Sequence, residues 1–192
     1  MYVRDAKNRE EVWLLDHIEE MELDETAFRS RDYVIALDEQ TGEKAGFGRI
    51  RIHKVDGDDV CELTSIGVLP EWRGQGVGAH VIERLIEHAR DEGFSFVYAL
   101  VDEPSYLARF GFERIAEDEL PDVLQGRLTE KRENVSPEAV SMVLSVSEFV
   151  MLARFREAFK RAESGDDEEP EESAEDFGID PDSASYKYDT GR

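Results

Sequence analysis

The sequence predicts an α+β fold in which helices flank a mixed, mostly antiparallel twisted sheet with one central parallel β-α-β unit. Two observations predict it. Apolar segments at 33–37, 45–55 and 60–68 are separated by the turn signals Thr41-Gly42 and Asp56-Gly57, which favours strands joined as hairpins. Within residues 60–100, a buried strand, a glycine-rich turn, a long amphipathic helix and a second apolar strand follow one another. Such a crossover makes its two strands parallel.

The first part of the chain is expected to form a short strand at 3–6 and then a helix. Asn8 and Glu11 resemble a capping box at the start of this helix. Its expected apolar face consists of Val12, Leu15, Ile18 and Met21. Three strands are predicted next, at 33–37, 45–55 and 60–68, and Asp56-Gly57 is a hairpin signal between the last two.

The long helix follows the glycine-rich turn and ends at Gly93, a residue typical of the position after a helix. Its apolar face contains Val81, Ile82, Leu85, Ile86 and Ala89. The remaining predicted elements are a strand at 96–100, a short helix at 104–110, a strand from Phe112 and a last strand at 140–146. One domain over residues 1–146 is therefore expected.

Two further segments follow this domain. Residues 147–163 are predicted to form a C-terminal helix capped by Ser147, with Phe149, Leu152, Phe155 and Phe159 on a partly apolar face. This face is expected to pack on the sheet or to form a homodimer interface, and the sequence leaves both open. Residues 164–192 are strongly acidic and too poor in apolar residues to bury a core, so a disordered tail is expected.

The formal net charge of the 192 residues is −23. This charge argues against binding to nucleic acid or anionic membranes, since both need basic surfaces. It favours a halophilic protein, because concentrated salt screens self-repulsion. The acidic tail alone does not account for it, since acids also crowd residues 10–24 and 113–122.

Cys61 is the only cysteine, so no internal disulfide can form, and a reducing cytoplasm is expected. Its place in an apolar strand is typical of a small core residue. No signal peptide or membrane span is recognisable, which predicts a soluble intracellular protein.

The turn between the buried strand and the long helix reads Arg73-Gly74-Gln75-Gly76-Val77-Gly78. Glycines let a ligand approach the backbone, and the first N–H groups of a helix have no intrahelical partners. Together with the helix dipole and Arg73, they predict a phosphate site. A Walker loop is excluded, because no Gly-Lys-Ser/Thr follows. The dinucleotide pattern fits poorly, because residues 70–73 intervene and too few β-α units follow.

The segment Val68-Leu69-Pro70 with Arg73 to Gly78 resembles the acyl-CoA loop of the GCN5-related N-acetyltransferase (GNAT) family, Q/R-x-x-G-x-G/A after a V-x-P turn. The order of elements from Tyr2 to Val146 also resembles that fold. The resemblance implies acetyl-CoA as co-substrate, held between two diverging strands. Its pyrophosphate would lie on residues 73–78, and its pantetheine would bond backbone groups of Ile66, Gly67 and Val68.

Direct acetyl transfer to an amine needs a base, a stabilised carbonyl oxygen and an acid for the leaving thiolate. Deprotonating a lysine amine near pH 7 costs about 4–5 kcal/mol, whereas an α-amine costs about 1–2 kcal/mol. Glu62 occupies the position where several family members place a glutamate that acts through water. Alternation is expected to put it on the same face as Thr64, Ile66 and Val68. An exposed structural glutamate is the alternative.

The resemblance also implies a tyrosine acid four residues before a Gly-Phe pair. Gly111-Phe112 matches that pair, but Leu107 stands at the tyrosine position and Tyr106 is one residue away. Tyr106 is the first candidate acid and Ser105 the second. Val68 N–H is the expected oxyanion donor.

His17, His53, His80 and His88 are expected to be unremarkable, and no metal site is predicted. The acceptor would be an amine of a small metabolite, an amino acid or a protein, and polyamines would suit the acidic surface. Glu119-Leu120-Pro121 faintly resembles short amino-acid acetyltransferases. The alternative to an enzyme is a CoA-binding sensor without turnover, which the missing tyrosine favours.

Overall fold

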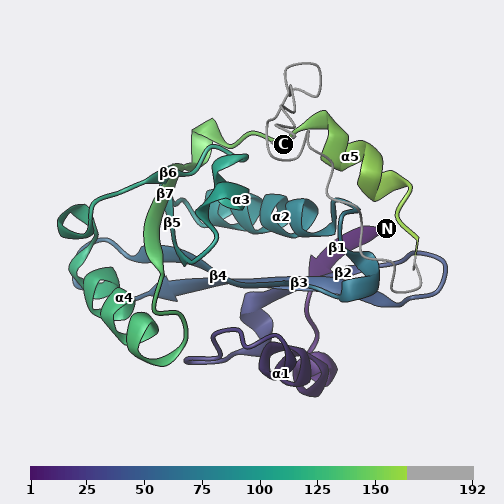
Figure 1. The fold of residues 1–192 in the computed structure, drawn as a ribbon, viewed down its shortest axis with the longest axis horizontal. Helices are drawn as coiled ribbons and strands as arrows, with labels where there is room; N and C mark the ends of the chain where they lie inside the picture. The colour runs from purple at the N-terminus through teal and green to yellow at the C-terminus, as the bar shows by residue number, and fades with distance from the viewer. Residues whose placement is uncertain (164–192) are drawn as a thin grey trace, which may run out of the picture.

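The computed structural model describes residues 1–163, which form one seven-stranded sheet with helices on both faces (Figure 1). The strand order is β1-β2-β3-β4-β5-β7-β6. The strands span Tyr2–Asp5 (β1), Tyr33–Leu37 (β2), Lys44–His53 (β3), Val60–Val68 (β4), Phe96–Val101 (β5), Glu113–Arg114 (β6) and Val140–Ser145 (β7). All pairs are antiparallel except β4 and β5, which confirms the predicted mixed sheet and its central β-α-β unit.

Residues 1–163 contain five α-helices: α1 (Glu11–Glu20), α2 (Val77–Asp91), α3 (Pro104–Ala108), α4 (Asp122–Asn134) and α5 (Ala153–Lys160). Short 3₁₀ helices span Asn8–Glu10, Ser30–Asp32, Pro70–Trp72, Glu117–Glu119 and Val146–Glu148. Helices α1 and α4 lie on one face of the sheet. Helix α2 lies on the opposite face beside α3, with α5 outside it (Figure 1).

Helix α2 forms the centre of the main core. Its apolar face is fully buried as predicted, and Cys61, Leu63 and Ala99 of the sheet belong to the same cluster. A second cluster lies under α1, and a third under α4. Cys61 is a buried free thiol, in agreement with the prediction.

The predicted cap of the first helix was wrong, and its predicted apolar face was right at Ile18 and Met21 but wrong at Val12. Leu14 and Ile18 are its buried residues, whereas Val12 is 69% exposed. The start is fixed by Glu10, whose carboxylate accepts a hydrogen bond from Lys7 N–H at 2.8 Å. The preceding 3₁₀ turn rotates the helix relative to the face expected from a single continuous helix.

The second half of the chain departs from the prediction in two places. Helix α4 was not predicted at all. The C-terminal helix is shorter than expected, because Ser147 lies in a separate 3₁₀ turn and α5 begins only at Ala153. Residues 149–152 lie between this 3₁₀ turn and α5. They are held near the end of α3, because Val150 N–H donates a hydrogen bond to Phe110 O at 3.0 Å. Helix α5 packs on α2 rather than on the sheet. The predicted disordered tail, 164–192, lies outside the described residues.

A β-bulge in β4 changes which side chains share a face. The β3–β4 register moves from Phe47↔Gly67 to Arg49↔Thr64, so β4 contains one extra residue there. Ser65 takes up this residue with φ +53°. Ile66 and Val68 consequently pack toward the α2 cluster, on the opposite face from Glu62. The expected alternation through Ile66 and Val68 was therefore wrong.

No helix within residues 1–163 is both long and apolar enough to cross a membrane.

Candidate functional site

The glycine-rich turn is held in place by a buried anchor on each side. Trp72 ends the 3₁₀ turn after β4 and is 1% exposed, and Val77 begins α2 with the same exposure. Between them, Gly74 and Gly76 both have positive φ, at +71° and +74°. These left-handed conformations favour glycine, which explains the residue type at both positions. The first backbone bond of the helix runs from His80 N–H to Gly76 O, at 3.2 Å.

The N-terminus of α2 therefore presents its first N–H groups next to a loop without side chains at Gly74 and Gly76. Arg73 is exposed beside them, and its Nε donates to Val68 O at 3.3 Å. The guanidinium is thus held where β4 ends. A helix N-terminus with an adjacent arginine suits a phosphate group, so the residues present fit the phosphates of an acyl-CoA.

The gap expected between β4 and β5 is present. The two strands pair only at Glu62↔Tyr98 and Leu63↔Ala99. Beyond that point β4 continues to Val68, and only its other edge pairs, with β3. The edge that includes Ile66, Gly67 and Val68 is therefore free of strand pairing on the β5 side. Backbone groups there suit an extended, amide-containing chain such as pantetheine.

Glu62 lies at the start of this gap and is completely buried. Its Oε2 is 2.7 Å from His53 Nε2 and 3.7 Å from Arg127 Nε. Its Oε1 has no hydrogen-bond partner among the described residues. The structure excludes the exposed structural glutamate considered from the sequence. The two carboxylate oxygens therefore differ: Oε2 lies against His53 and Arg127, whereas Oε1 is unpaired within residues 1–163.

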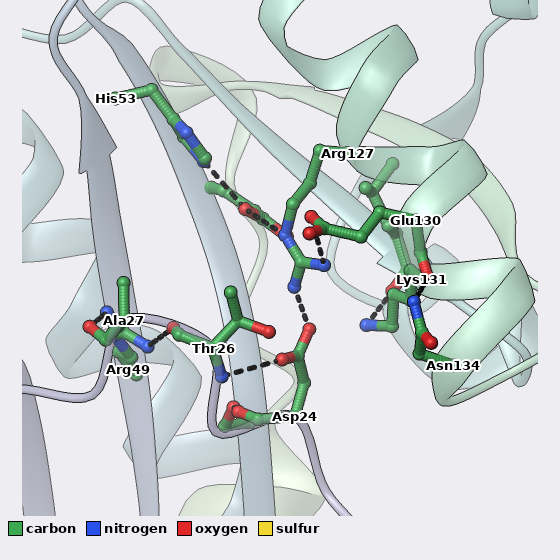
Figure 2. A network of polar contacts seen from close by, with 12 residues as sticks. Asp24, Thr26, Ala27, Arg49, His53, Arg127, Glu130, Lys131 and Asn134 are labelled. Atoms are coloured by element: carbon green, nitrogen blue, oxygen red, sulfur yellow. Dashed lines mark hydrogen bonds and ion pairs between the residues drawn. The ribbon is translucent and has the colours of Figure 1, made fainter.

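Helix α4 and the loop after α1 bring charged side chains to the Glu62 side of the sheet (Figure 2). Arg127 of α4 forms an ion pair with Asp24, from the loop after α1, and lies 3.9 Å from Glu130. Lys131, one turn further along α4, donates to Leu100 O at 2.6 Å. That carbonyl belongs to β5 just past its pairing with β4, so Lys131 reaches the margin of the gap between the two strands.

The loop that carries Asp24 is itself fastened to the sheet. Ser65 Oγ donates to Asp24 O at 2.6 Å, and Thr26 N–H donates to the Asp24 carboxylate at 2.9 Å. Arg49 of β3 donates to Thr26 O at 2.9 Å, and it also bonds Ala27 O (Figure 2). The bulge at Ser65 thus fixes both the strand and the loop beside Glu62.

Burial controls the electrostatics of this cluster. Loss of water lowers the pKa of Lys131, with the nearby Glu62 carboxylate opposing the change, and burial likewise lowers the pKa of Arg127. Two carboxylates and two cations are nevertheless packed together, so their charges offset one another. Thr64 Oγ1 and Arg127 Nε, like Glu62 Oε1, are buried there without a hydrogen bond within the described residues. Buried polar groups without partners in a native protein need an explanation, such as a bound water, an ion or a catalytic role.

Tyr106 lies on the other face of the sheet from Glu62. A Cβ added to Gly78 would lie 2.9 Å from Tyr106 Oη, so the phenol packs against the first turn of α2. Burial raises the pKa of Tyr106 to about 12, with Arg109 opposing the shift. Leu107, at the position expected for a tyrosine, is buried in the core, and Ser105 is exposed.

The histidines are less ordinary than the sequence indicated. His53 is paired with Glu62, and His80 is half-buried with its ring stacked on Phe159, at 3.7 Å between centroids. Sequence reasoning also missed Asp24, Arg127 and Lys131. The His53–Glu62 pair could have been predicted from the hairpin. His53 lies opposite Val60, and Glu62 is two residues further along β4, so the side chains of His53 and Glu62 share one face of the sheet.

Within residues 1–163, no three His, Cys, Asp or Glu side chains are close enough together to hold a metal ion.

Comparison with known proteins places this geometry in context. A family model described as the acetyltransferase (GNAT) family matches residues 2–112, more than half of the chain. A mycothiol acetyltransferase of Thermobifida fusca is 33% identical over 115 residues, which are 55% of this chain and 34% of that protein. An amino-acid acetyltransferase of Mycobacterium tuberculosis is 35% identical over 57 residues, which are 30% of this chain and 33% of that protein. The chain thus spans about a third of each relative.

Solved structures share the fold. The N-acetylglutamate synthase of Neisseria gonorrhoeae, complexed with coenzyme A and N-acetyl-glutamate, superposes with a TM-score of 0.61 at 22% identity, covering 76% of this chain and 35% of that one. A Mycobacterium tuberculosis protein solved with CoA also gives a TM-score of 0.61, at 20% identity, and covers 76% of this chain and 99% of that one.

Proposed function

Because the chain belongs to the GNAT family of acetyltransferases, we propose that it transfers an acetyl group directly from acetyl-CoA to a primary amine. One observation carries the proposal: the unpaired edge of β4 runs directly into the glycine-rich turn at the N-terminus of α2. A ligand that consists of an extended chain and a pyrophosphate would match this arrangement. The chain would lie along the β4 edge, and the pyrophosphate would lie at the turn. Names of the relatives and CoA in related structures support the same activity.

The proposed co-substrate site consists of the β4 edge and the turn. Backbone groups of Ile66, Gly67 and Val68 would bond the pantetheine. The pyrophosphate would contact the turn, whose members are Arg73, Gly74, Gln75, Gly76, Val77 and Gly78. Val68 N–H, at the end of β4, is proposed to stabilise the carbonyl oxygen.

The reaction requires that the amine lose a proton, that its nitrogen bond to the acetyl carbon, and that the thiolate leave and take up a proton. We assign the first proton to Glu62, whose Oε1 has no hydrogen-bond partner among the described residues while Oε2 is held by His53. Tyr106 is proposed as the acid for the thiolate. Its raised pKa keeps the phenol protonated at neutral pH, so the proton is present when the thiolate forms.

The acceptor is proposed to be a small amine. Glu62 is fully buried beneath α4 and beside the loop that carries Asp24, and a lysine on a folded protein would need a wide approach to reach it. The names of the relatives, which include an amino-acid acetyltransferase, support an amino-acid-like acceptor. Arg127 and Lys131 supply positive charge next to Glu62, which suits an acceptor that also carries a carboxylate.

Release of free thiol from acetyl-CoA, measured with a panel of amino acids, aminosugars, polyamines and a lysine-containing peptide, tests the proposal. We expect release that depends on one class of small amine. Binding of CoA without release for any amine would instead identify a CoA sensor. Absence of binding would contradict the co-substrate site itself.

The setting of this activity is also proposed. The net charge of −23 supports a halophilic protein, and a single buried thiol supports a cytoplasmic location. A homodimer remains a proposal whose test is the mass measured by light scattering in molar KCl.

A further inference from the structure

Helix α5 covers the same glycine-rich turn that the proposed function assigns to the co-substrate. The helix lies on the side of α2 that faces away from the sheet (Figure 1). A Cβ added to Gly76 would overlap the carbonyl oxygen of Phe155 and would lie 3.3 Å from Phe159 N. The backbone of α5 is therefore in direct contact with the loop, at the glycine that begins α2.

The aromatic side chains of α5 extend this contact in two directions. Phe159 is 7% exposed and stacks on His80, which is in the first turn of α2. Phe155 contacts Tyr106 edge-on at 6.5 Å and lies 5.5 Å from Phe110, between ring centroids. The helix thus bridges the space between the N-terminus of α2 and the short helix α3.

Polar contacts fasten both flanks of α5. Gln75, within the glycine-rich turn, donates from Nε2 to Glu163 O and accepts from Glu163 N–H, each at 2.9 Å. Arg156 forms an exposed bidentate ion pair with Glu83 of α2, with Nη1 3.2 Å from Oε2. Gln75 uses both ends of its amide to hold the chain after α5, so it cannot use them for a phosphate at the same time.

Helix α5 is a weakly held element. It has only eight residues, and helices of this length are marginal without tertiary packing. Only Phe159 is fully buried within it, and the ion pair to Glu83 is exposed to solvent. Exposed pairs of this kind contribute little. A bound ligand that gains several phosphate contacts at the loop can therefore compete with the α5 contacts.

We propose that α5 is an autoinhibitory lid: it closes the acyl-CoA phosphate loop in the ligand-free protein and moves away from α2 when acyl-CoA binds. This inference rests on the proposed function, since it assumes that the loop binds acyl-CoA. A closed lid weakens the observed affinity for CoA. The observed dissociation constant equals the intrinsic one divided by the fraction of molecules in which the lid is open. Variants that loosen α5 should consequently bind CoA more tightly.

The full-length chain allows a matched test by calorimetric titration with CoA. Arg156→Glu replaces the ion pair to Glu83 with a repulsion and should tighten CoA binding about 2- to 10-fold. Arg114→Glu is the control: it makes the same charge change at an exposed arginine, but on β6 and not on α5. The double variant Glu83→Arg/Arg156→Glu restores an ion pair and should return the affinity to the wild-type value.

Amide hydrogen exchange on the wild-type chain gives an independent measurement. Saturating CoA should speed the exchange of amides in residues 156–163 and slow that of residues 74–79. Slower exchange in both segments would overturn the lid, because α5 would then form part of the bound site. Equal affinities of the two single variants would also overturn it. CoA binding by none of the proteins would overturn the proposed function along with the lid, and this outcome is distinguishable from the other two.

Discussion

At the scale of single residues, the arrangement around Glu62 separates the two oxygens of one carboxylate. His53 and Arg127 approach Oε2, while Oε1 has no partner within residues 1–163. A carboxylate held on one side keeps its orientation, which a proton acceptor needs. In the proposed function, His53 would therefore be a positioning residue that acts through Glu62.

Replacement of Glu62 by Gln should lower turnover most at low pH and leave CoA affinity unchanged. A base matters most where the acceptor amine is largely protonated, so the loss should shrink as pH rises toward the pKa of the amine. The pH profile of thiol release checks this. Glu130→Gln is a matched control, since Glu130 lies near Arg127 but is exposed. A loss that is constant across pH would make Glu62 structural.

Glu10 illustrates a residue whose charge supports the fold. Arg4 donates to both of its carboxylate oxygens, at 2.7 and 2.8 Å, and this pairing lowers the pKa of Glu10 from 4.5 to about 2. A carboxyl with a lowered folded pKa stabilises the protein above its unfolded pKa and loses this effect as pH falls. The shift corresponds to at most about 3 kcal/mol at neutral pH.

Glu10→Gln should therefore lower the free energy of unfolding at pH 7, by up to about 3 kcal/mol. The difference from wild type should diminish between pH 4.5 and pH 2, as the wild-type carboxyl also becomes neutral. Denaturation at fixed high salt, compared at pH 7, 4 and 3, checks this prediction. A difference that does not depend on pH would assign the effect to packing instead of charge.

At the scale of elements, β4, the glycine-rich turn and α2 could be predicted from the sequence because their signals are local. Proline, glycines and apolar periodicity mark every boundary within residues 60–93. Helix α4 has no such signal: Leu124 and Leu128 face the core, but Arg127 and Lys131 are buried next to them. Buried cations interrupt the apolar pattern, and their partners come from β4, β5 and the loop after α1.

The difference between local signals and long-range contacts also explains which parts of the candidate site could be predicted from the sequence. Arg73 to Gly78 and Glu62 were identified because their spacing resembles a known motif. The bulge at Ser65 was not, since it depends on the loop around Asp24 that it binds. Placement of α5 on α2 likewise depends on Phe159 meeting His80, a contact between residues 79 positions apart that no local pattern predicts.

Arg73→Ala tests the turn without disturbing its backbone. Gly76 is a poor choice for this purpose, since any side chain there meets both a strained φ and the α5 backbone. Arg73 is exposed, and its Nε donates a hydrogen bond to Val68 O. Loss of one charge-assisted phosphate contact should weaken CoA binding about tenfold, with stability unchanged. Calorimetry checks this against Arg114→Ala, an exposed arginine on β6. Equal CoA affinities of the two variants would contradict a phosphate site at Arg73.

At the scale of the whole molecule, the net charge is the basis for proposing a halophilic protein. Residues 164–192 contain eleven acidic and two basic residues, which leaves a formal charge of −14 on residues 1–163. Much of the positive charge in the described part is already used in pairs with carboxylates, as at Arg4, Arg127 and Arg132. The remaining surface repels itself, and it also repels CoA, which is a polyanion.

Folding or CoA affinity should consequently require high salt. At 0.01 M ionic strength the Debye length is about 30 Å, so nearly the whole acidic surface acts on the incoming cofactor, whereas at 1 M it is about 3 Å. The charges nearest the loop then dominate. They are Arg73, the α2 N-terminus, and Arg154, Glu157 and Arg161, which line the cavity beside Gly74 and Gln75. Titration of KCl from millimolar to molar, with folding and CoA binding followed separately, checks the requirement. A chain that ends at Glu163 should need less salt but still some, because −14 remains. Full stability and affinity in dilute buffer would contradict a halophilic protein and leave the acetyltransferase proposal intact.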